Sequence, residues 1–312
     1  MLSKLDLMIM EELEEDARMP VQALAKKLSA ARTTIRYRLN RLRNERIVSI
    51  ACISDAECLG YQLPLLIGMN TSPGQTGSVA DQLMSLSSVK VVFLTVGHYD
   101  ILVWAIFRDR ASLTHFMSTE LTSVSHITTI ETMHFYHWMR DSWRYFKTQT
   151  ESDRRCPRYK VNDFDLSIVK AMQKHPRQTI TQLAKTVGCS TSVAKTNLER
   201  LINDGIIRFV SIIDPTALGY NTGAIILIMC KPDRAYGAAT ELSVKDTARF
   251  VSLITGQWQI FFGAQFKDSE HMNRFLSDEL SCIAGIIKYE VVNIRKVLKY
   301  AFDFTSQPIL SK

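Results

Sequence analysis

The sequence has few of the features that mark secreted, membrane or zinc-binding proteins. Its six cysteines form no CxxC pair and no zinc-ligand spacing with the seven histidines. The longest uninterrupted apolar run, 224–230, is far shorter than the roughly 20 residues that a membrane-spanning helix needs. The N-terminus lacks the basic-then-apolar order of a secretory signal. We therefore expect a reduced, cytoplasmic protein with no metal site and no membrane partner.

The chain also lacks the short motifs of common catalytic and nucleotide-binding sites. It has no nucleophile elbow, Walker loop or HExxH helix. Charge is modest, because 38 basic residues against 31 acids leave a net charge of +7. Such a charge is as typical of a solvated surface as of a nucleic-acid-binding protein. We expect no enzyme, no catalytic residue and no cofactor.

What the sequence does contain is an internal repeat at a constant offset of 159 residues. A repeat of this length, without gaps from about residue 5 to about residue 131, indicates two copies of a whole domain set. The differences between the copies then bear on function. Matched pairs include Asp6 with Asp165, Leu24-Ala25 with Leu183-Ala184, Gly60-Tyr61 with Gly219-Tyr220, Gly97 with Gly256, and Glu131 with Glu290.

Each copy begins with three short amphipathic helices and continues with strands and helices in the order βαββαβ. The helices, at 3–16, 21–28 and 30–46 and again within 163–207, are typical of a helix-turn-helix domain. The βαββαβ order predicts a ferredoxin-like sandwich. In the first copy its elements are expected at 62–70, 78–86, 89–96, 101–107, 112–122 and from 127 to about 146.

The predicted fold class is therefore α+β, with two copies of a winged-helix-like helix-turn-helix domain, each followed by a sandwich. We expect the first helix-turn-helix domain at 1–50, the first sandwich at 60–147, and a polar linker at 148–160. A second, degenerate helix-turn-helix domain is expected at 161–210 and the second sandwich at 219–305.

The third helix of the first copy, here called the recognition helix, has the composition of a DNA-binding surface. Ile35, Leu39 and Leu42 fall on one side of a helical wheel, and polar residues fall opposite them. Between residues 29 and 46 there are six arginines and one acid. Guanidinium groups can bind both phosphate and guanine. The predicted DNA contacts are Arg32, Thr33, Thr34, Arg36, Tyr37, Asn40, Arg41 and Arg43.

The corresponding helix of the second copy does not have this composition. Residues 188–205 contain two cations and two acids, and Glu199 stands where Asn40 faces the groove. We expect this domain to bind DNA weakly or to serve in packing. Its predicted outer face consists of Ser192, Lys195, Thr196, Glu199 and Arg200. Gly205 suits a left-handed helix end, whereas Arg46 at the equivalent position of the first copy predicts mild strain.

These residues resemble the Lrp/AsnC family of feast/famine transcription regulators. The resemblance covers both halves and rests on an ordered set: Leu5-Asp6-x-x-Ile9, Arg18, Leu24-Ala25, Leu28-Ser29, Arg38-x-x-Arg41-Leu42, Ile47-Val48, Gly60-Tyr61 and Gly97-x-Tyr99-Asp100. It implies a helix-turn-helix domain joined to a βαββαβ effector domain, called RAM, that dimerises through its sheet. Most members carry one copy, so this chain resembles a tandem fusion whose two effector domains pair within one polypeptide.

The resemblance also implies a site for a small effector such as an amino acid. Its residues would be Gly97, Tyr99 and Asp100 in the turn between two strands, with Thr129 and Thr132 on a later strand. The second copy has Trp258-Gln259 in place of Tyr99-Asp100. An Asp in a turn also commonly serves its own backbone, so both roles stay open for Asp100.

An enzymatic alternative follows from the same scaffold, because siroheme decarboxylases resemble this family and are sometimes tandem fusions. The candidate catalytic residues would be His98, His115, His134 and His137. In a regular strand, His134, Tyr136 and Trp138 would share one face, opposite Phe135 and His137, so the two histidines would not converge. Aromatic packing at an interface is the simpler interpretation.

The sequence thus predicts a DNA-binding transcription regulator of Lrp/AsnC type. Its expected partners are double-stranded DNA, a second copy of the chain associating through RAM-like domains, and a small effector.

Overall fold

A computed structural model describes residues 2–141, 144–146 and 161–300, which form two compact units. One unit is built from residues 1–59 and 143–218 and the other from 60–142 and 219–312. The chain therefore passes through each unit twice. The predicted linker at 148–160 lies outside the described residues.

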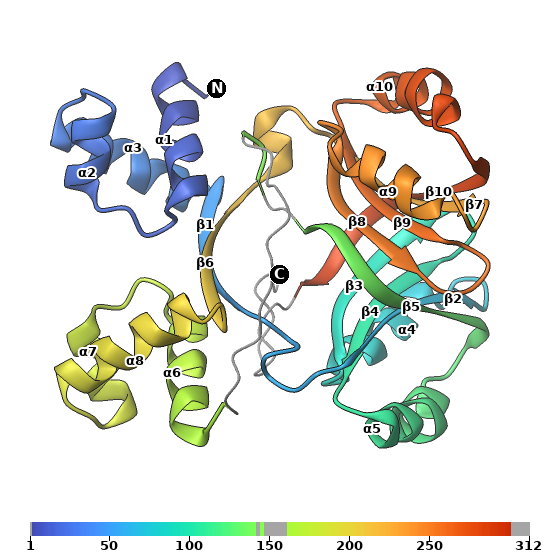
Figure 1. The fold of residues 1–312 in the computed structure, drawn as a ribbon, viewed down its shortest axis with the longest axis horizontal. Helices are drawn as coiled ribbons and strands as arrows, with labels where there is room; N and C mark the ends of the chain where they lie inside the picture. The colour runs from blue at the N-terminus through green and yellow to red at the C-terminus, as the bar shows by residue number, and fades with distance from the viewer. Residues whose placement is uncertain (1, 142–143, 147–160, 301–312) are drawn as a thin grey trace. The chain divides into compact units, whose positions relative to one another are not determined.

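The first unit contains two groups of three helices, as predicted (Figure 1). The first group is α1 (Lys4–Glu15), α2 (Val21–Lys27) and α3 (Arg32–Asn44), followed by strand β1 (Val48–Ser54). The second group is α6 (Asp163–Lys174), α7 (Ile180–Val187) and α8 (Thr191–Asn203), followed by strand β6 (Ile207–Ile213). The recognition helix is α3, and α8 is its counterpart.

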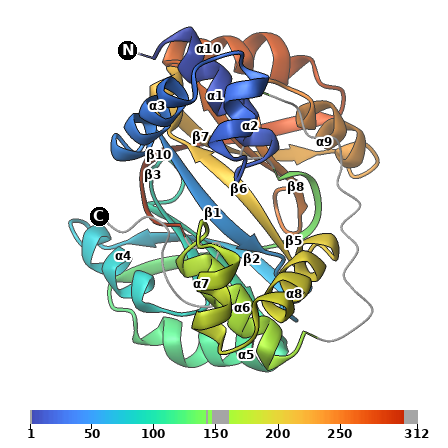
Figure 2. The same ribbon diagram turned by 90° about the vertical axis from the view of Figure 1, so that its left-hand side faces the viewer.

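Strands β1 and β6 pair antiparallel and join the two helical groups (Figures 1 and 2). Val48 lies opposite Ile213, and Ser54 lies opposite Ile207. Ile213 also packs into the buried core of the first group, beside Leu42. A two-stranded antiparallel ribbon, with one strand from each group, therefore holds the two helix-turn-helix groups together. We predicted neither strand, and β1 extends beyond residue 50.

The second unit is a closed eight-stranded barrel with helices on its outside (Figure 1). Its elements are, in chain order, β2 (Leu63–Thr71), α4 (Thr76–Ser85), β3 (Val89–Val96), β4 (Ile101–Phe107), α5 (Arg110–His115), β5 (Ile127–Asp141), β7 (Thr222–Cys230), α9 (Ala235–Ser243), β8 (Ala248–Ile254), β9 (Ile260–Phe266), α10 (Ser269–Arg274) and β10 (Ile286–Tyr300). A π-helical and a 3-10 turn follow both α5 and α10. The mixed α+β class is thus confirmed, and the strand order around the barrel is β10-β3-β4-β2-β5-β8-β9-β7.

Pairing between the halves of the chain closes this barrel. β5 of the first half pairs with β8 of the second, and β10 of the second pairs with β3 of the first. Side chains from both halves, including Leu102, Phe135, Leu227 and Phe261, form one buried core inside it. Two further cores lie outside the barrel, one in each half of the chain, between the strands of that half and its helices. The interior is therefore filled by side chains, and each half completes the other.

Strand β5 departs from the regular alternation expected for its aromatic segment. Its register with β8 shifts between Phe135 and His137 and again between Trp138 and Arg140, which marks two β-bulges. Trp138 therefore stacks on Phe135, with ring centroids 4.8 Å apart, while Tyr136 is exposed. Our assignment of Trp138 to the face of Tyr136 was wrong, because each bulge turns the side chains that follow it. The strand also ends at Asp141, not near residue 146.

Candidate nucleic-acid interface

The recognition helix α3 has one buried and one exposed side, as the helical wheel predicts. Ile35, Leu39 and Leu42 are at most 1 % exposed. On the opposite side Tyr37 is 67 % exposed, although an aromatic ring usually packs against other residues. Of the predicted DNA contacts, Arg32, Thr33, Thr34, Arg36, Tyr37 and Asn40 are exposed, and Arg41 and Arg43 are half-buried.

Arg41 has a second role that we did not predict. Its Nη2 donates a 2.8 Å hydrogen bond to Oδ2 of Asp6, a fully buried residue of α1. The helical wheel places Arg41 beside the exposed face, and from the sequence we expected it not to face the core. That expectation was wrong, because 35 residues separate Arg41 from a partner that only the packing of α1 on α3 brings close. Loss of Arg41 would therefore weaken the domain as well as any DNA contact.

The carboxylate of Asp6 is the centre of a small network. Its Oδ2 accepts hydrogen bonds from the backbone N and the Oγ of Ser3, both at 2.7 Å, and from Nη1 of Arg38 at 3.2 Å. Burial alone would raise the pKa of Asp6, but the hydrogen bonds from Ser3 and the charges of Arg41 and Arg38 hold that pKa below its ordinary value. Asp6 is therefore an anion at neutral pH.

The second copy repeats the ion pair but not the second arginine. Arg200 donates to the buried Asp165, which is equivalent to Asp6, and also to Oδ1 of Asn197 at 2.9 Å. Asn197 occupies the position of Arg38. Arg200, which we predicted on the outer face of this helix, is 34% exposed and is bound to a buried acid that we did not predict, as is Arg41. On the exposed side of α8, Lys195 lies 3.8 Å from Glu199, so this surface has no excess of positive charge.

The helix ends of the two groups differ in capping. α7 and α8 begin after Thr179 and Ser190, whose side-chain oxygens accept backbone N–H groups. α2 and α3 begin after Pro20 and Ala31, which provide no side-chain cap. An N-cap of this kind contributes about 1 kcal/mol. The neutral second group thus has the more stable local structure, and the basic first group has the less stable one.

Left-handed backbone at two turns adds to this difference. Ser29 and Arg46 have φ of 49° and 57°, where the second copy has Gly188 and Gly205 at 73° and 72°. Arg46 thus has the left-handed conformation on which the expected strain depends.

Replacing Arg46 by glycine should stabilise the first group. Relief of the left-handed strain outweighs the extra flexibility of glycine, so we expect the free energy of unfolding to rise by about 1 kcal/mol. Urea denaturation followed by far-UV circular dichroism measures it. The mirror change Gly205→Arg should lower stability by a similar amount. Unchanged midpoints in both variants would contradict a strained turn.

The predicted effector residues lie close together in the barrel unit, but they are engaged with each other and with the core. Tyr99 is 2 % exposed, and its hydroxyl donates to Oε2 of Glu131 at 2.5 Å. Burial and this bond to Glu131 raise the pKa of Tyr99. Asp100 accepts from the backbone N of Thr71 at 2.8 Å and from its Oγ1 at 3.1 Å. The carboxylate of Asp100 therefore bonds to β2 and not to the backbone of its own turn, so it has a structural partner other than the one we considered.

The other members of that set lie at the edges of the same region. Thr129 accepts a hydrogen bond from Nδ2 of Asn70 at 3.0 Å, and Thr132 is exposed on β5. Gly97 has a φ of 135° and lies against β10, where an added Cβ would come within 2.8 Å of the carbonyl oxygen of Val291. Glycine at position 97 is therefore required by the close approach of the β10 backbone, irrespective of any ligand.

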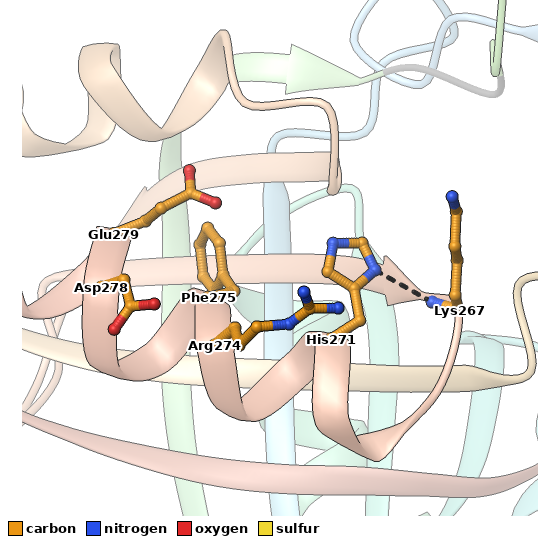
Figure 3. Close-up of a pocket in the computed structure, with 6 residues that line it drawn as sticks. All are labelled: Lys267, His271, Arg274, Phe275, Asp278 and Glu279. Atoms are coloured by element: carbon orange, nitrogen blue, oxygen red, sulfur yellow. Dashed lines mark hydrogen bonds between the residues drawn. The ribbon is translucent and has the colours of Figure 1, made fainter.

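The four histidines of the enzymatic alternative are dispersed. His98 is exposed in the turn after β3, His115 is exposed on α5, and His134 and His137 lie on β5. In the described part of the chain, no three His, Cys, Asp or Glu side chains are grouped as metal ligands. An open hollow on α10 is lined by other residues, with Lys267, His271 and Arg274 at one end and Asp278 and Glu279 at the other (Figure 3). None of the predicted site residues lines it.

Comparisons with known proteins address the family. A family model described as AsnC-type helix-turn-helix domain matches residues 2–43, one described as Lrp/AsnC ligand binding domain matches 65–137, and one described as winged helix-turn-helix DNA-binding matches 161–208. The HTH-type transcriptional regulator FL11 of Pyrococcus abyssi is 30% identical over 153 residues, which are 49% of this chain and 99% of the relative. This chain belongs to the Lrp/AsnC family.

One further relative and one solved structure complete the comparison. The HTH-type transcriptional regulator LrpA of Pyrococcus horikoshii is 30% identical over 133 residues, 42% of this chain and 93% of its own. Over 96% of this chain and 93% of the other, the fold is similar to that of the siroheme decarboxylase NirDL, with a TM-score of 0.68 and 14% identity. At that identity the similarity concerns the fold alone. Within the described residues, no helix is long and apolar enough to cross a bilayer.

Proposed function

We propose that this Lrp/AsnC protein is a sequence-specific DNA-binding transcription regulator and that its first helix-turn-helix domain makes the base contacts. The observation that carries the proposal is the exposed face of α3, where Arg36, Tyr37 and Asn40 point away from a core of three aliphatic residues. Arginine and asparagine form bidentate hydrogen bonds with guanine and adenine, and a helix of this kind fits the major groove. The proposed contacts are those predicted above, with Arg41 shared between DNA and Asp6.

We further propose that the chain is a tandem duplication in which the second helix-turn-helix domain has lost DNA contacts. The constant offset, the matching element order and the coincident left-handed turns support a common origin. The neutral surface of α8 and its better-capped helices support a packing role. The proposed domains keep the expected boundaries with three exceptions: β1 extends the first helix-turn-helix domain to residue 54, β6 extends the second to residue 213, and the last strand of the first sandwich ends at residue 141.

Each chain has one basic recognition helix, and this bears on how many chains bind one operator. Because the barrel is completed inside one polypeptide, a single chain carries two helix-turn-helix domains but one DNA-reading surface. We propose that two chains associate on an operator with two half-sites, since recognition helices are normally presented in pairs about one helical turn apart. A small effector remains part of the proposal, with Gly97, Tyr99, Asp100, Thr129 and Thr132 as the residues nearest to its site.

The experiment that tests the main proposal is selection of bound fragments from random duplex DNA, with and without a mixture of amino acids. We expect enrichment of one sequence whose symmetry reports the number of bound chains. If each complex neutralises roughly five to eight phosphates, the logarithm of affinity should fall steeply with the logarithm of salt concentration. Failure to enrich any sequence, with or without amino acids, would contradict the proposal.

The siroheme decarboxylase alternative rests on the whole-chain fold and has its own test. Titration of the protein with an iron tetrapyrrole should give no tight complex in the Soret region if the protein is a regulator. A tight spectral complex, together with no retention of DNA fragments, would favour the enzyme. The exposed arginine-rich face of α3 has no role in that alternative, which is why we prefer the regulator.

A further inference from the structure

The arginines of the recognition helix lie along both borders of its exposed face, and only those on one border are bound to a buried acid. On a wheel of about 100° per residue, Arg32, Arg36 and Arg43 fall on one side of the exposed face. Arg38 and Arg41 fall on the other side, next to α1, where both reach Asp6. A helix in the major groove lies between two phosphate backbones, so cations on both edges match the charge of both.

The edge next to α1 carries two cations that are held in place. Two guanidinium groups share the single buried carboxylate of Asp6, and Nε of Arg41 also lies 3.9 Å from Oε1 of the exposed Glu45, so Arg38 is the cation of this edge without a carboxylate of its own. Asp6 has no exposed surface, whereas the side chains of Arg38 and Arg41 are 28% and 27% exposed. The two cations therefore extend from a buried anchor to the solvent, and their orientation is set before any ligand arrives.

The hydrogen bonds of Arg38 leave donors available on the outside. Its Nη1 donates to Asp6 and to Oγ of Ser3, at 3.2 and 3.1 Å. Among the described residues its Nη2 and Nε have no hydrogen-bond partner and are not buried. A guanidinium with one fixed and one free edge is suited to bind a phosphate oxygen.

The second copy provides the contrast. Asp165 and Arg200 keep the buried ion pair, but Asn197 replaces Arg38, so this cluster has one cation fewer than the first. The ion pair is therefore enough to pack the first and third helices of such a domain, and the second arginine has a purpose other than packing.

We infer that Asp6 is a positioning residue for DNA binding, which holds Arg38 and Arg41 so that Arg38 binds a phosphate of the DNA backbone on the α1 side of the groove. The inference rests on the proposed function and adds a contact, Arg38, that the sequence pattern did not identify. It also gives the buried acid of α1 a role in the DNA complex in addition to its role in folding.

The first test copies the second domain into the first. Arg38→Asn should fold normally, because the second copy has asparagine at this position, and should weaken binding to the selected DNA about 5- to 10-fold. The slope of log affinity against log salt should become shallower by about 0.9 for each bound chain, the value for one lost phosphate contact. The matched change Asn197→Arg should leave both quantities unchanged. An unaltered salt slope in Arg38→Asn would overturn the inference.

The second test separates positioning from simple charge. Asp6→Asn removes a negative charge beside the DNA, so electrostatics alone predicts tighter binding. Loss of positioning predicts weaker binding by several-fold at a temperature where circular dichroism shows the variant to be folded. Asp165→Asn removes the equivalent buried charge and should lower the melting temperature without weakening DNA binding.

The outcomes separate this inference from the proposed function. Absence of sequence-specific binding by the wild-type chain would remove the proposed function itself. Wild-type binding together with equal or tighter binding by Asp6→Asn would leave the regulator in place and overturn the positioning role.

Discussion

Replacing Arg36 by alanine is expected to lower the affinity for the selected operator by about 10- to 100-fold, the cost of one bidentate base contact of about 1–3 kcal/mol. Arg36 is exposed on α3, outside the Asp6 network, and no ion pair with it is present among the described residues. Its loss should therefore leave the melting temperature nearly unchanged, as is usual for exposed positions. Fluorescence anisotropy with labelled operator DNA measures the affinity.

The repeat supplies the control for this variant. Lys195 holds the equivalent position on α8, is likewise exposed, and lies beside Glu199. Lys195→Ala should change operator affinity by less than about twofold if the second domain does not contact bases. Equal losses in the two variants would mean that both domains read DNA. If Arg36→Ala instead bound the operator with full affinity, the proposal that α3 contacts the bases through Arg36 would be contradicted.

Replacing Gly97 by alanine is expected to destabilise the barrel by about 3 kcal/mol or more. Two effects add: a φ of 135° that residues with a side chain rarely adopt, and a Cβ placed 2.8 Å from the backbone oxygen of Val291. That oxygen belongs to β10, which closes the barrel against β3, so the neighbour cannot yield without opening the seam between the halves. Urea unfolding followed by tryptophan fluorescence measures the change, because Trp104, Trp138 and Trp258 lie in the barrel unit.

Gly256 is the matched position in the second half. Its φ is 108°, but the nearest atom to an added Cβ is the side-chain Cγ of Met133 at 3.9 Å. Gly256→Ala should therefore show the backbone strain alone, about 1–2 kcal/mol. Equal stabilities of the two variants would mean that the contact between the added Cβ at position 97 and β10 costs no free energy of folding. The close approach of β10 would then not explain the glycine at position 97.

Much of the fold was predictable because its signals are local. The apolar spacing of Ile35, Leu39 and Leu42 identifies the buried side of α3 without knowledge of what covers it. Strands β3 and β4 begin and end where their apolar runs do. The candidate site followed from the same periodicity, since the side opposite a buried stripe must face outward.

Other parts of the site were not predictable, because they depend on residues that are distant in sequence. Asp6 precedes Arg41 by 35 residues, and the pattern offers no means to decide that an arginine on an exposed helix edge has a buried partner. A comparison of the copies held the signal: aspartate and arginine recur together at 165 and 200, while the neighbouring exposed positions have changed.

By itself, the sequence determined that two similar sets of elements exist, which side of each helix is buried, and that positive charge is concentrated on one of the two third helices. These properties follow from side-chain periodicity and charge, which act over a few residues. Only the tertiary structure decided that the halves close one barrel, that β1 pairs with β6, and that Asp6 binds two arginines of α3. Backbone hydrogen bonds between strands are nearly independent of side-chain identity, so the choice of partner is made by the packing of the whole chain.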